Sequence, residues 1–224
     1  GGQAGGQRFV EARDITESKV KLMQDNIERT ALINMNAVVA DATVFLPASE
    51  EKADILLADV PCSGLGVIGR KPDIRYKMTE KKQEDIVKLQ RQILDTVWKY
   101  VKVGGTLVYS TCTIGAEENQ YNLKWFLDNY PFKLESIDPY LPEELQGKTT
   151  RAGYLQLLPG IHESDGFFLA RLKEGIRMME KTDIRSLNLE ELKAWFKERG
   201  GKALPGRASS ISGCTRSSRE ALTR

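Results

Sequence analysis

The chain has 224 residues, of which 41% are hydrophobic and 29% charged, and its formal net charge is +2. This length and composition exclude a fibre, a collagen or a disordered tail, and they fit one globular domain whose core needs no disulfide staples. The small net charge does not by itself indicate a nucleic-acid-binding protein.

The three cysteines, Cys62, Cys112 and Cys214, are too few for a disulfide framework in a chain of this length, which favours a reducing compartment. No stretch approaches the roughly 20 apolar residues of a membrane span, and the glycine-rich N-terminus has no apolar signal core. We therefore expect a cytoplasmic protein without membrane attachment. With a single histidine, His162, and scattered cysteines, the sequence shows no metal-ligand spacing, so no metal is expected.

The first part of the chain alternates predicted strands with a helix. Apolar runs predict strands at residues 8–14, 36–41 and 53–59, and each run ends in an aspartate. The third run, ADILLAD, is too continuous for a half-exposed strand and is typical of a buried parallel one. After the first strand, Thr16 is expected to cap a helix with one apolar face. The apolar residues of that face are Val20, Met23 and Ile27.

The middle of the chain repeats the alternation. A stripe of apolar residues predicts a helix over residues 79–100, which stops at Gly104-Gly105 and leads into a strand at residues 106–110. A further helix is predicted over residues 116–129. Such alternation indicates a parallel sheet covered on both faces, with ligands at the carboxyl ends of the strands.

The pattern changes towards the end of the predicted domain, which covers residues 1–173. Residues 154–158 and 167–172 flank the turn sequence PGIHESDG, which suits an antiparallel hairpin with His162 in its turn. Residues 174–187 are interpreted as a linker and residues 188–200 as a capped C-terminal helix. Residues 201–224 are rich in Ser, Arg and Gly and are predicted to be disordered.

Residues 64–69, GLGVIG, match the glycine fingerprint of dinucleotide-binding proteins. That motif needs a helix directly afterwards, because backbone N–H groups at the helix start hold the pyrophosphate. Pro72 resists a helix there, so we favour a flexible basic loop over a nicotinamide site.

A stronger signal comes from two cysteines at neighbouring strand ends. Asp59 and Cys62 follow one predicted strand, and Cys112 follows the next. Adjacent parallel strands lie about 4.8 Å apart, so both thiols are expected to face one crevice. The N–H groups at the start of the helix predicted at Ala116 would favour a thiolate nucleophile. The alternative is that both cysteines are ordinary buried side chains.

These residues resemble a known family. The segments DVPCSGLGVIGRKPDIR and STCT are similar to the two signature motifs of the Sun family of S-adenosylmethionine-dependent RNA cytosine-5 methyltransferases, RsmB type, and PGIHESDGFFLARLK is similar to its closing hairpin. The resemblance implies an α/β fold, a Rossmann-like class I methyltransferase sheet that is mostly parallel with a closing antiparallel hairpin. The family's glycine-rich first motif is not found before Arg8. We therefore expect a sheet lacking its first, central strand, and S-adenosylmethionine binding that is weak or absent.

The resemblance also implies a role for each site residue. Cys112 would be the nucleophile that adds to carbon 6 of cytosine, and Cys62 would assist its release. Asp59 would hold the base and lie near the cofactor. Asp14 would bind the ribose hydroxyls of S-adenosylmethionine and Asp41 its adenine, although either aspartate could instead cap a helix or a loop.

RNA is the implied partner, ribosomal RNA first, and a monomer is expected. Four basic residues would contact RNA phosphates, although a solvated loop explains them equally well. They are Arg70, Lys71, Arg75 and Lys77. Two other functions stay open: a non-catalytic RNA-binding remnant of such a domain, and a thiol oxidoreductase. Residues 176–203 separately resemble the opening segment of RlmN-type radical enzymes that methylate adenine in RNA.

Overall fold

The computed structural model describes residues 9–175. The glycine-rich N-terminus and the predicted C-terminal helix and tail lie outside the described residues, as do the segment that resembles RlmN-type enzymes and nearly all of the predicted linker. The side chains of Arg75 and Lys77 are also outside the description.

The first strands form a small parallel sheet with one helix. β1 (Val10–Asp14) pairs with β2 (Met35–Val39), and α1 (Glu17–Arg29) connects them. Val20 of α1 is buried while Met23 and Ile27 are half-buried, which confirms the predicted inward face of this helix. Thr16 precedes α1 as expected, but its side chain makes no cap.

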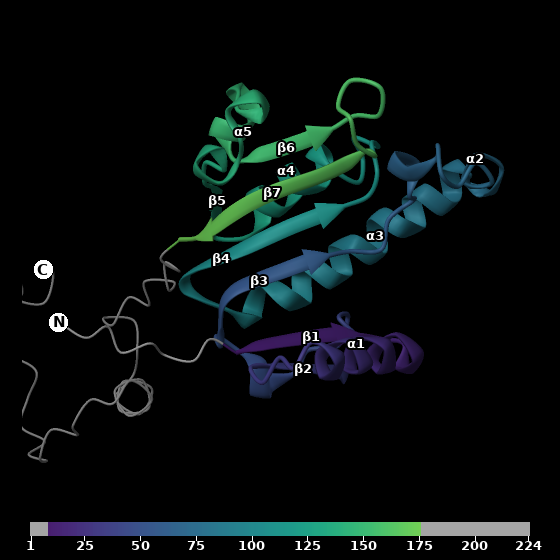
Figure 1. Ribbon diagram of the computed structural model, residues 1–224. Helices are drawn as coiled ribbons and strands as arrows, with labels where there is room; N and C mark the ends of the chain where they lie inside the picture. The colour runs from purple at the N-terminus through teal and green to yellow at the C-terminus, as the bar shows by residue number, and fades with distance from the viewer. Residues whose placement is uncertain (1–8, 176–224) are drawn as a thin grey trace, which may run out of the picture. The chain divides into compact units, whose positions relative to one another are not determined.

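The remaining strands form a second, five-stranded sheet in the order β3-β4-β7-β5, with β6 also pairing with β7. β3 and β4 are parallel, whereas β7 runs antiparallel to β4, β5 and β6, as the arrows in Figure 1 show. The parallel part and the closing hairpin of β6 and β7 confirm the predicted fold class. The strands are β3 (Ala53–Asp59), β4 (Val101–Thr111), β5 (Phe132–Leu134), β6 (Tyr154–Leu157) and β7 (Phe167–Glu174).

Helices α3 (Glu80–Val97) and α4 (Gln120–Asn129) cover one face of this sheet (Figure 1). Leu94 and Phe126 on these helices pack with Leu107, Phe168 and other buried side chains in one apolar core. The shorter helices are α2 (Ile74–Lys77), α5 (Lys148–Ala152) and the 3-10 turns η1 (Pro47–Ser49), η2 (Leu65–Val67), η3 (Trp98–Tyr100), η4 (Asp138–Tyr140) and η5 (Glu143–Leu145). No helix within residues 9–175 has the length and apolar character needed to span a membrane.

β3 is less buried than its continuous apolar sequence predicts. Ala58 is buried, but Ile55 and Leu57 are 72% and 66% exposed. Within the described residues β3 pairs only with β4, so its other edge has no strand beside it. Within residues 9–175 neither β1 nor β2 pairs with β3, so the two sheets are separate.

Two predicted boundaries are wrong. β4 begins at Val101 rather than at residue 106, because the chain enters the sheet before Gly104 and Gly105 and bulges there; Gly104 has a φ of 73°. Helix α4 begins at Gln120 rather than at Ala116, and residues 116–119 form a turn.

Candidate active site at the ends of strands β3 and β4

The predicted neighbouring strand ends are confirmed. Asp59 is the last residue of β3 and lies opposite Ser110 of β4 in the parallel register. The Ser110 hydroxyl donates a hydrogen bond to Asp59 Oδ1 over 3.0 Å. This bond fixes one carboxylate oxygen of an exposed aspartate at the edge where both cysteine loops begin.

The two cysteines meet directly. Cys62 Sγ and Cys112 Sγ are 2.9 Å apart, and the Cys112 backbone N–H also points at Cys62 Sγ over 3.3 Å. Both are free thiols and both are half-buried, so neither is sealed in the apolar core. The prediction that the thiols of two separate strand ends lie side by side is therefore confirmed.

Burial raises the pKa of the Cys62 thiol to about 12, and the hydrogen bond and charge interaction with Cys112 act in the same direction. Cys62 therefore keeps its proton at neutral pH and can donate a hydrogen bond to the neighbouring sulfur. The helix predicted to start at Ala116 starts at Gln120 instead, because residues 116–119 form a turn, so the N–H groups expected to favour a thiolate belong to that turn.

Buried polar side chains surround the two cysteine loops, and the sequence analysis missed them. Glu118 and Asn119 come from the turn that replaces the predicted helix start, and Gln90 comes from α3. Gln90 lies on the apolar stripe of α3, four residues after Ile86 and three before Ile93. A polar residue at such a position is a signal for a buried hydrogen-bonded group.

Gly66, within residues 64–69, serves close packing of the loops rather than nucleotide binding. The Gly66 N–H donates to the Cys112 carbonyl over 3.0 Å, and the Gly66 carbonyl accepts from the Gly166 N–H over 2.8 Å. A Cβ on Gly66 would lie 2.1 Å from the Gly166 oxygen, so no larger residue fits where these loops cross. Only the short turn η2 follows Gly64, which supports the rejection of a dinucleotide site.

The two other aspartates lie together at the ends of β1 and β2. Asp14 Oδ1 accepts from the Thr16 N–H over 2.8 Å, and this bond is the main cause that lowers the pKa of Asp14. Asp41 Oδ1 accepts from both the hydroxyl and the N–H of Thr43, which lower the pKa of Asp41. Both carboxylates are thus charged hydrogen-bond acceptors close to the ends of neighbouring strands.

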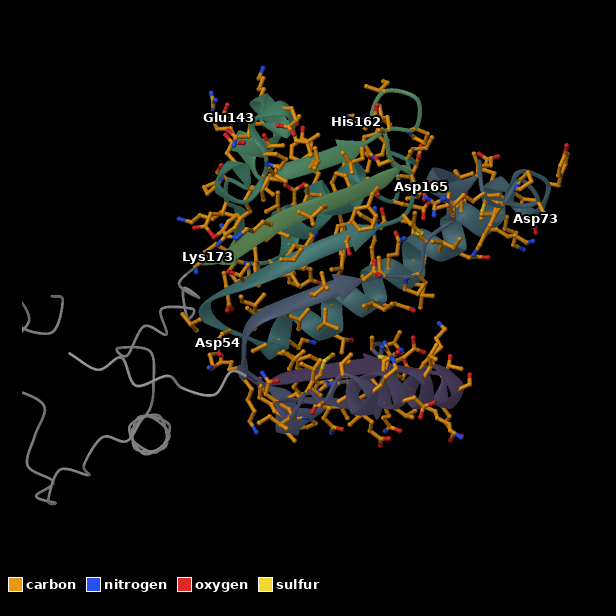
Figure 2. All side chains as sticks on the ribbon, viewed as in Figure 1. Asp54, Asp73, Glu143, His162, Asp165 and Lys173 are labelled. Atoms are coloured by element: carbon orange, nitrogen blue, oxygen red, sulfur yellow. The ribbon has the colours of Figure 1, made fainter. Side chains whose placement is uncertain are left out.

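The basic residues predicted to bind RNA follow η2. Arg70 is largely exposed, but its Nε lies 3.1 Å from Asp165 Oδ2, so this ion pair ties the basic segment to the β6–β7 turn. Lys71 is exposed. Tyr76, on α2, is 84% exposed and offers an aromatic ring to solvent. Figure 2 labels Asp165 and Asp73 at this end of the molecule.

His162 has a structural place in the β6–β7 turn, as predicted. Its Nδ1 accepts from the Leu158 N–H over 3.0 Å, and Figure 2 labels it on this turn. Among residues 9–175, no group of three or more His, Cys, Asp or Glu side chains could hold a metal ion.

Comparison with known proteins adds a family to this geometry. The family model described as 16S rRNA methyltransferase RsmB/F matches residues 4–173. The ribosomal RNA small subunit methyltransferase F of Cronobacter sakazakii is 36% identical over 170 residues, which are 75% of this chain and 35% of the relative. The chain thus spans about a third of the length of the curated relatives it matches.

Solved structures show the same fold. The crystal structure of PH0851 superposes with a TM-score of 0.67 at 33% identity and covers 74% of this chain and 37% of its own. NSun6 from Pyrococcus horikoshii, whose structure was determined with SFG, gives a TM-score of 0.60 at 29% identity and covers 74% and 41%. The curated relatives carry the name of the F type rather than the B type of the sequence resemblance, and the family model includes both.

Proposed function

The chain belongs to the 16S rRNA methyltransferase RsmB/F family, and from this premise we propose that it methylates carbon 5 of a cytosine in ribosomal RNA, with S-adenosylmethionine as the methyl donor and a covalent Cys112–cytosine adduct on the way. The single observation that carries the proposal is the contact between the sulfurs of Cys62 and Cys112, 2.9 Å apart, beside the strand end that carries Asp59.

The reaction needs a nucleophile because carbon 5 of cytosine does not accept an electrophilic methyl group unaided. The Cys112 thiolate adds to carbon 6, which makes carbon 5 an enamine carbon. Asp59 hydrogen-bonds the ring nitrogen or the exocyclic amine and stabilises the charge that develops there. After methylation, a base, water in the simplest case, takes the proton from carbon 5; the electron pair of that C–H bond forms the carbon 5–carbon 6 double bond and expels Cys112 as a thiolate, which restores the aromatic ring.

The environment of the two thiols supports this division of roles. The raised pKa of Cys62 makes it a poor nucleophile, because only a thiolate attacks. A protonated Cys62 at 2.9 Å from Cys112 can donate an S–H hydrogen bond to the sulfur that leaves the base and so stabilises the departing thiolate. Cys112 is therefore the better candidate for the attack and Cys62 for the release.

The proposed binding of S-adenosylmethionine depends on the aspartates at the ends of β1 and β2. S-adenosylmethionine, when bound, supplies the methyl group from its sulfonium centre. Asp14 would accept hydrogen bonds from its ribose hydroxyls, and Asp41 would accept from its adenine amino group, since both bonds from Thr43 use Oδ1 and leave Oδ2 for a ligand. The relative NSun6 was solved with SFG, an S-adenosylmethionine analogue, which supports this ligand class.

The substrate is proposed to be single-stranded or extruded RNA, because a base in a duplex cannot reach a thiol. The exposed ring of Tyr76 can stack on a base, and Lys71 can contact a phosphate. The names of the curated relatives specify ribosomal RNA.

Trapping with RNA that contains 5-fluorocytosine tests the proposal. Fluorine replaces the proton that must leave carbon 5, so the enzyme stalls as a covalent complex after methyl transfer. We expect a denaturation-resistant protein–RNA band when S-adenosylmethionine is present at a concentration high enough to offset the weak binding expected from the sequence, and we expect Cys112→Ser to abolish it. A non-catalytic RNA-binding protein gives no such band, and a thiol oxidoreductase is indifferent to the base. A band that survives in Cys112→Ser would refute the assignment of the nucleophile.

A further inference from the structure

A buried carboxylate lies between the two cysteine loops. Glu118 is 0% exposed, although it carries an ionisable group, and it lies in the turn that connects β4 to α4. Three neutral donors converge on it: a backbone N–H, an amide and a hydroxyl. They come from Ser63, Gln90 and Thr113.

The loop that carries Cys62 is held on both sides of the cysteine. The Ser63 N–H donates to Glu118 Oε2 over 2.8 Å. On the other side, Gln90 Nε2 donates to the Pro61 carbonyl over 2.8 Å and reaches the same Glu118 oxygen at 3.2 Å. The peptide groups before and after Cys62 are therefore fixed to one side chain of α3 and one of the β4–α4 turn.

The loop that carries Cys112 is held in the same way. The Thr113 hydroxyl donates to Glu118 Oε1 over 3.4 Å and accepts from the Ser63 hydroxyl over 2.8 Å. The Thr113 carbonyl accepts from Asn119 Nδ2 over 3.0 Å, while Asn119 Oδ1 accepts from the hydroxyl of Thr111 over 2.6 Å. Glu118 is thus bonded to the residue that follows each cysteine.

Burying a carboxylate among neutral donors is costly unless every bond is made. An apolar residue would fill the same space at lower cost, but it would leave the Ser63 N–H without an acceptor. A buried carboxylate at this position is explained if Glu118 fixes the geometry of the two cysteine loops.

We propose that Glu118 is a positioning residue that holds Cys62 and Cys112 at the distance where one sulfur can donate a hydrogen bond to the other. Its meaning for catalysis rests on the proposed function, but its effect on the two thiols does not. The carboxylate does not touch the base. It acts through Ser63 and Thr113 on the two cysteine loops.

The first test measures thiol proximity without RNA or cofactor. Dibromobimane becomes fluorescent only when it links two thiols, and the reaction is followed in a Cys214→Ser background so that the site thiols alone respond. Glu118→Gln keeps the shape of the side chain, but its amide has only one acceptor atom. If that oxygen takes the place of Oε2, Thr113 loses its acceptor; if it takes the place of Oε1, Ser63 and Gln90 lose theirs. We expect cross-linking to slow about tenfold, in line with the loss of hydrogen bonds to a buried charged group.

Glu117→Gln is the matched control, because Glu117 is the adjacent residue and is exposed. It removes the same charge, and we expect its cross-linking rate to equal that of the reference. A folded Glu118→Gln protein that cross-links at the reference rate would overturn the proposal. So would an equal loss of rate in the two variants, which would show a charge effect without positioning.

Thr113→Val covers the case in which Glu118→Gln does not fold. It preserves the shape and removes only the hydroxyl that joins Ser63 to Glu118. We expect about a threefold slower cross-linking from the loss of these neutral bonds. A reference rate in folded Thr113→Val would overturn the proposal by itself.

The catalytic readout separates this inference from the proposed function. If both hold, Glu118→Gln lowers kcat for methyl transfer about tenfold and leaves the KM for RNA unchanged, whereas a purely structural defect lowers only the amount of folded protein. If cross-linking slows but the reference chain forms no adduct on 5-fluorocytosine RNA, positioning stands and the proposed function fails. If the reference chain forms the adduct and Glu118→Gln changes neither rate, the proposed function stands and the positioning role fails.

Discussion

The two pairs of strand ends that carry site residues are built differently. At β3 and β4, the cysteine loops are fixed by side chains far along the chain, Gln90 and Glu118. At β1 and β2, each aspartate bonds within its own turn, to a residue two positions later. Long-range bonds define one geometry, whereas local turns orient a carboxylate whatever surrounds it. The thiols are thus preorganised by the fold, and the acids only by their immediate sequence.

The exposure of apolar side chains follows the same division. Phe168 of β7 and Leu107 of β4 are fully buried in the sheet whose strand ends carry the cysteine loops. Val10 of β1 and Val39 of β2 are 49% and 52% exposed, and Ile55 of β3 is 72% exposed. We call the ends of β3 and β4, with their cysteine loops, the cysteine end, and the ends of β1 and β2, with Asp14 and Asp41, the acid end. Substitutions should therefore have large effects on activity and stability at the cysteine end and small ones at the acid end.

The largest effect is expected from removal of the nucleophile. Cys112→Ser should lower methyl transfer from S-adenosylmethionine to RNA by at least about a thousandfold, because the oxygen of serine is a far weaker nucleophile without a base to activate it. Transfer of a radiolabelled methyl group measures this, and Cys214→Ser is the control that should keep full activity. Methyl transfer by Cys112→Ser at a rate close to that of the reference chain would show that Cys112 is not the nucleophile.

Alkylation of Cys62 should be slow at ordinary pH. A pKa raised from the usual range to about 12 leaves about a thousandfold less thiolate at pH 8. Reactivity should increase as pH rises towards that value, since the thiol loses its proton only there. Iodoacetamide labelling read by peptide mass spectrometry over a pH series measures this. A midpoint near pH 9 for Cys62 would mean that the site is not as enclosed as described.

A methyl group at the crossing of the loops should destabilise the fold. Gly66→Ala places a Cβ 2.1 Å from the Gly166 oxygen and 2.7 Å from the Cys112 oxygen, and both are backbone atoms. We expect the free energy of unfolding to fall by about 1–3 kcal/mol. Chemical denaturation measures it. Gly69→Ala is the matched control, because nothing lies within 4 Å of its Cβ, and it should stay within about 0.5 kcal/mol of the reference.

The smallest effects are expected at the acid end. Asp41→Asn keeps an oxygen that can accept from Thr43, so the turn should remain and thermal unfolding should not change. Affinity for S-adenosylmethionine, measured by equilibrium dialysis, should fall about tenfold at most, because the substitution removes no more than one hydrogen bond to the ligand. Asp14→Asn should behave alike. A loss of folding in either variant would contradict the contrast between the two ends.

Sequence patterns were sufficient for the parts of the site that depend on strand order. Alternating runs predicted β1 to β4 and the β6–β7 hairpin, and neighbouring parallel strands brought Cys62 and Cys112 together. Patterns failed where long-range contacts decide. The pattern of residues 116–119 predicts a helix. The segment instead forms a turn, in which the buried Glu118 and Asn119 form hydrogen bonds with the cysteine loops.

The misjudged burial of β3 has a similar cause. The sequence ADILLAD carries apolar residues on both faces, but a strand is buried on both faces only if something covers each one. Within the described residues, Leu56 and Ala58 face the core while Ile55 and Leu57 do not. Composition alone cannot show which face of a strand is covered.

The central claim is that Cys112 attacks the cytosine and the neighbouring Cys62 assists its release. The Cys62→Ala variant on ordinary RNA without fluorine tests this claim most directly. With S-adenosylmethionine present, the account predicts a covalent protein–RNA complex on a denaturing gel, because the base adds to Cys112 and is not released. The double variant with Cys112→Ser should show none. A complex that persists in the double variant, or one that is absent from Cys62→Ala although 5-fluorocytosine traps the unmodified chain, would contradict the account.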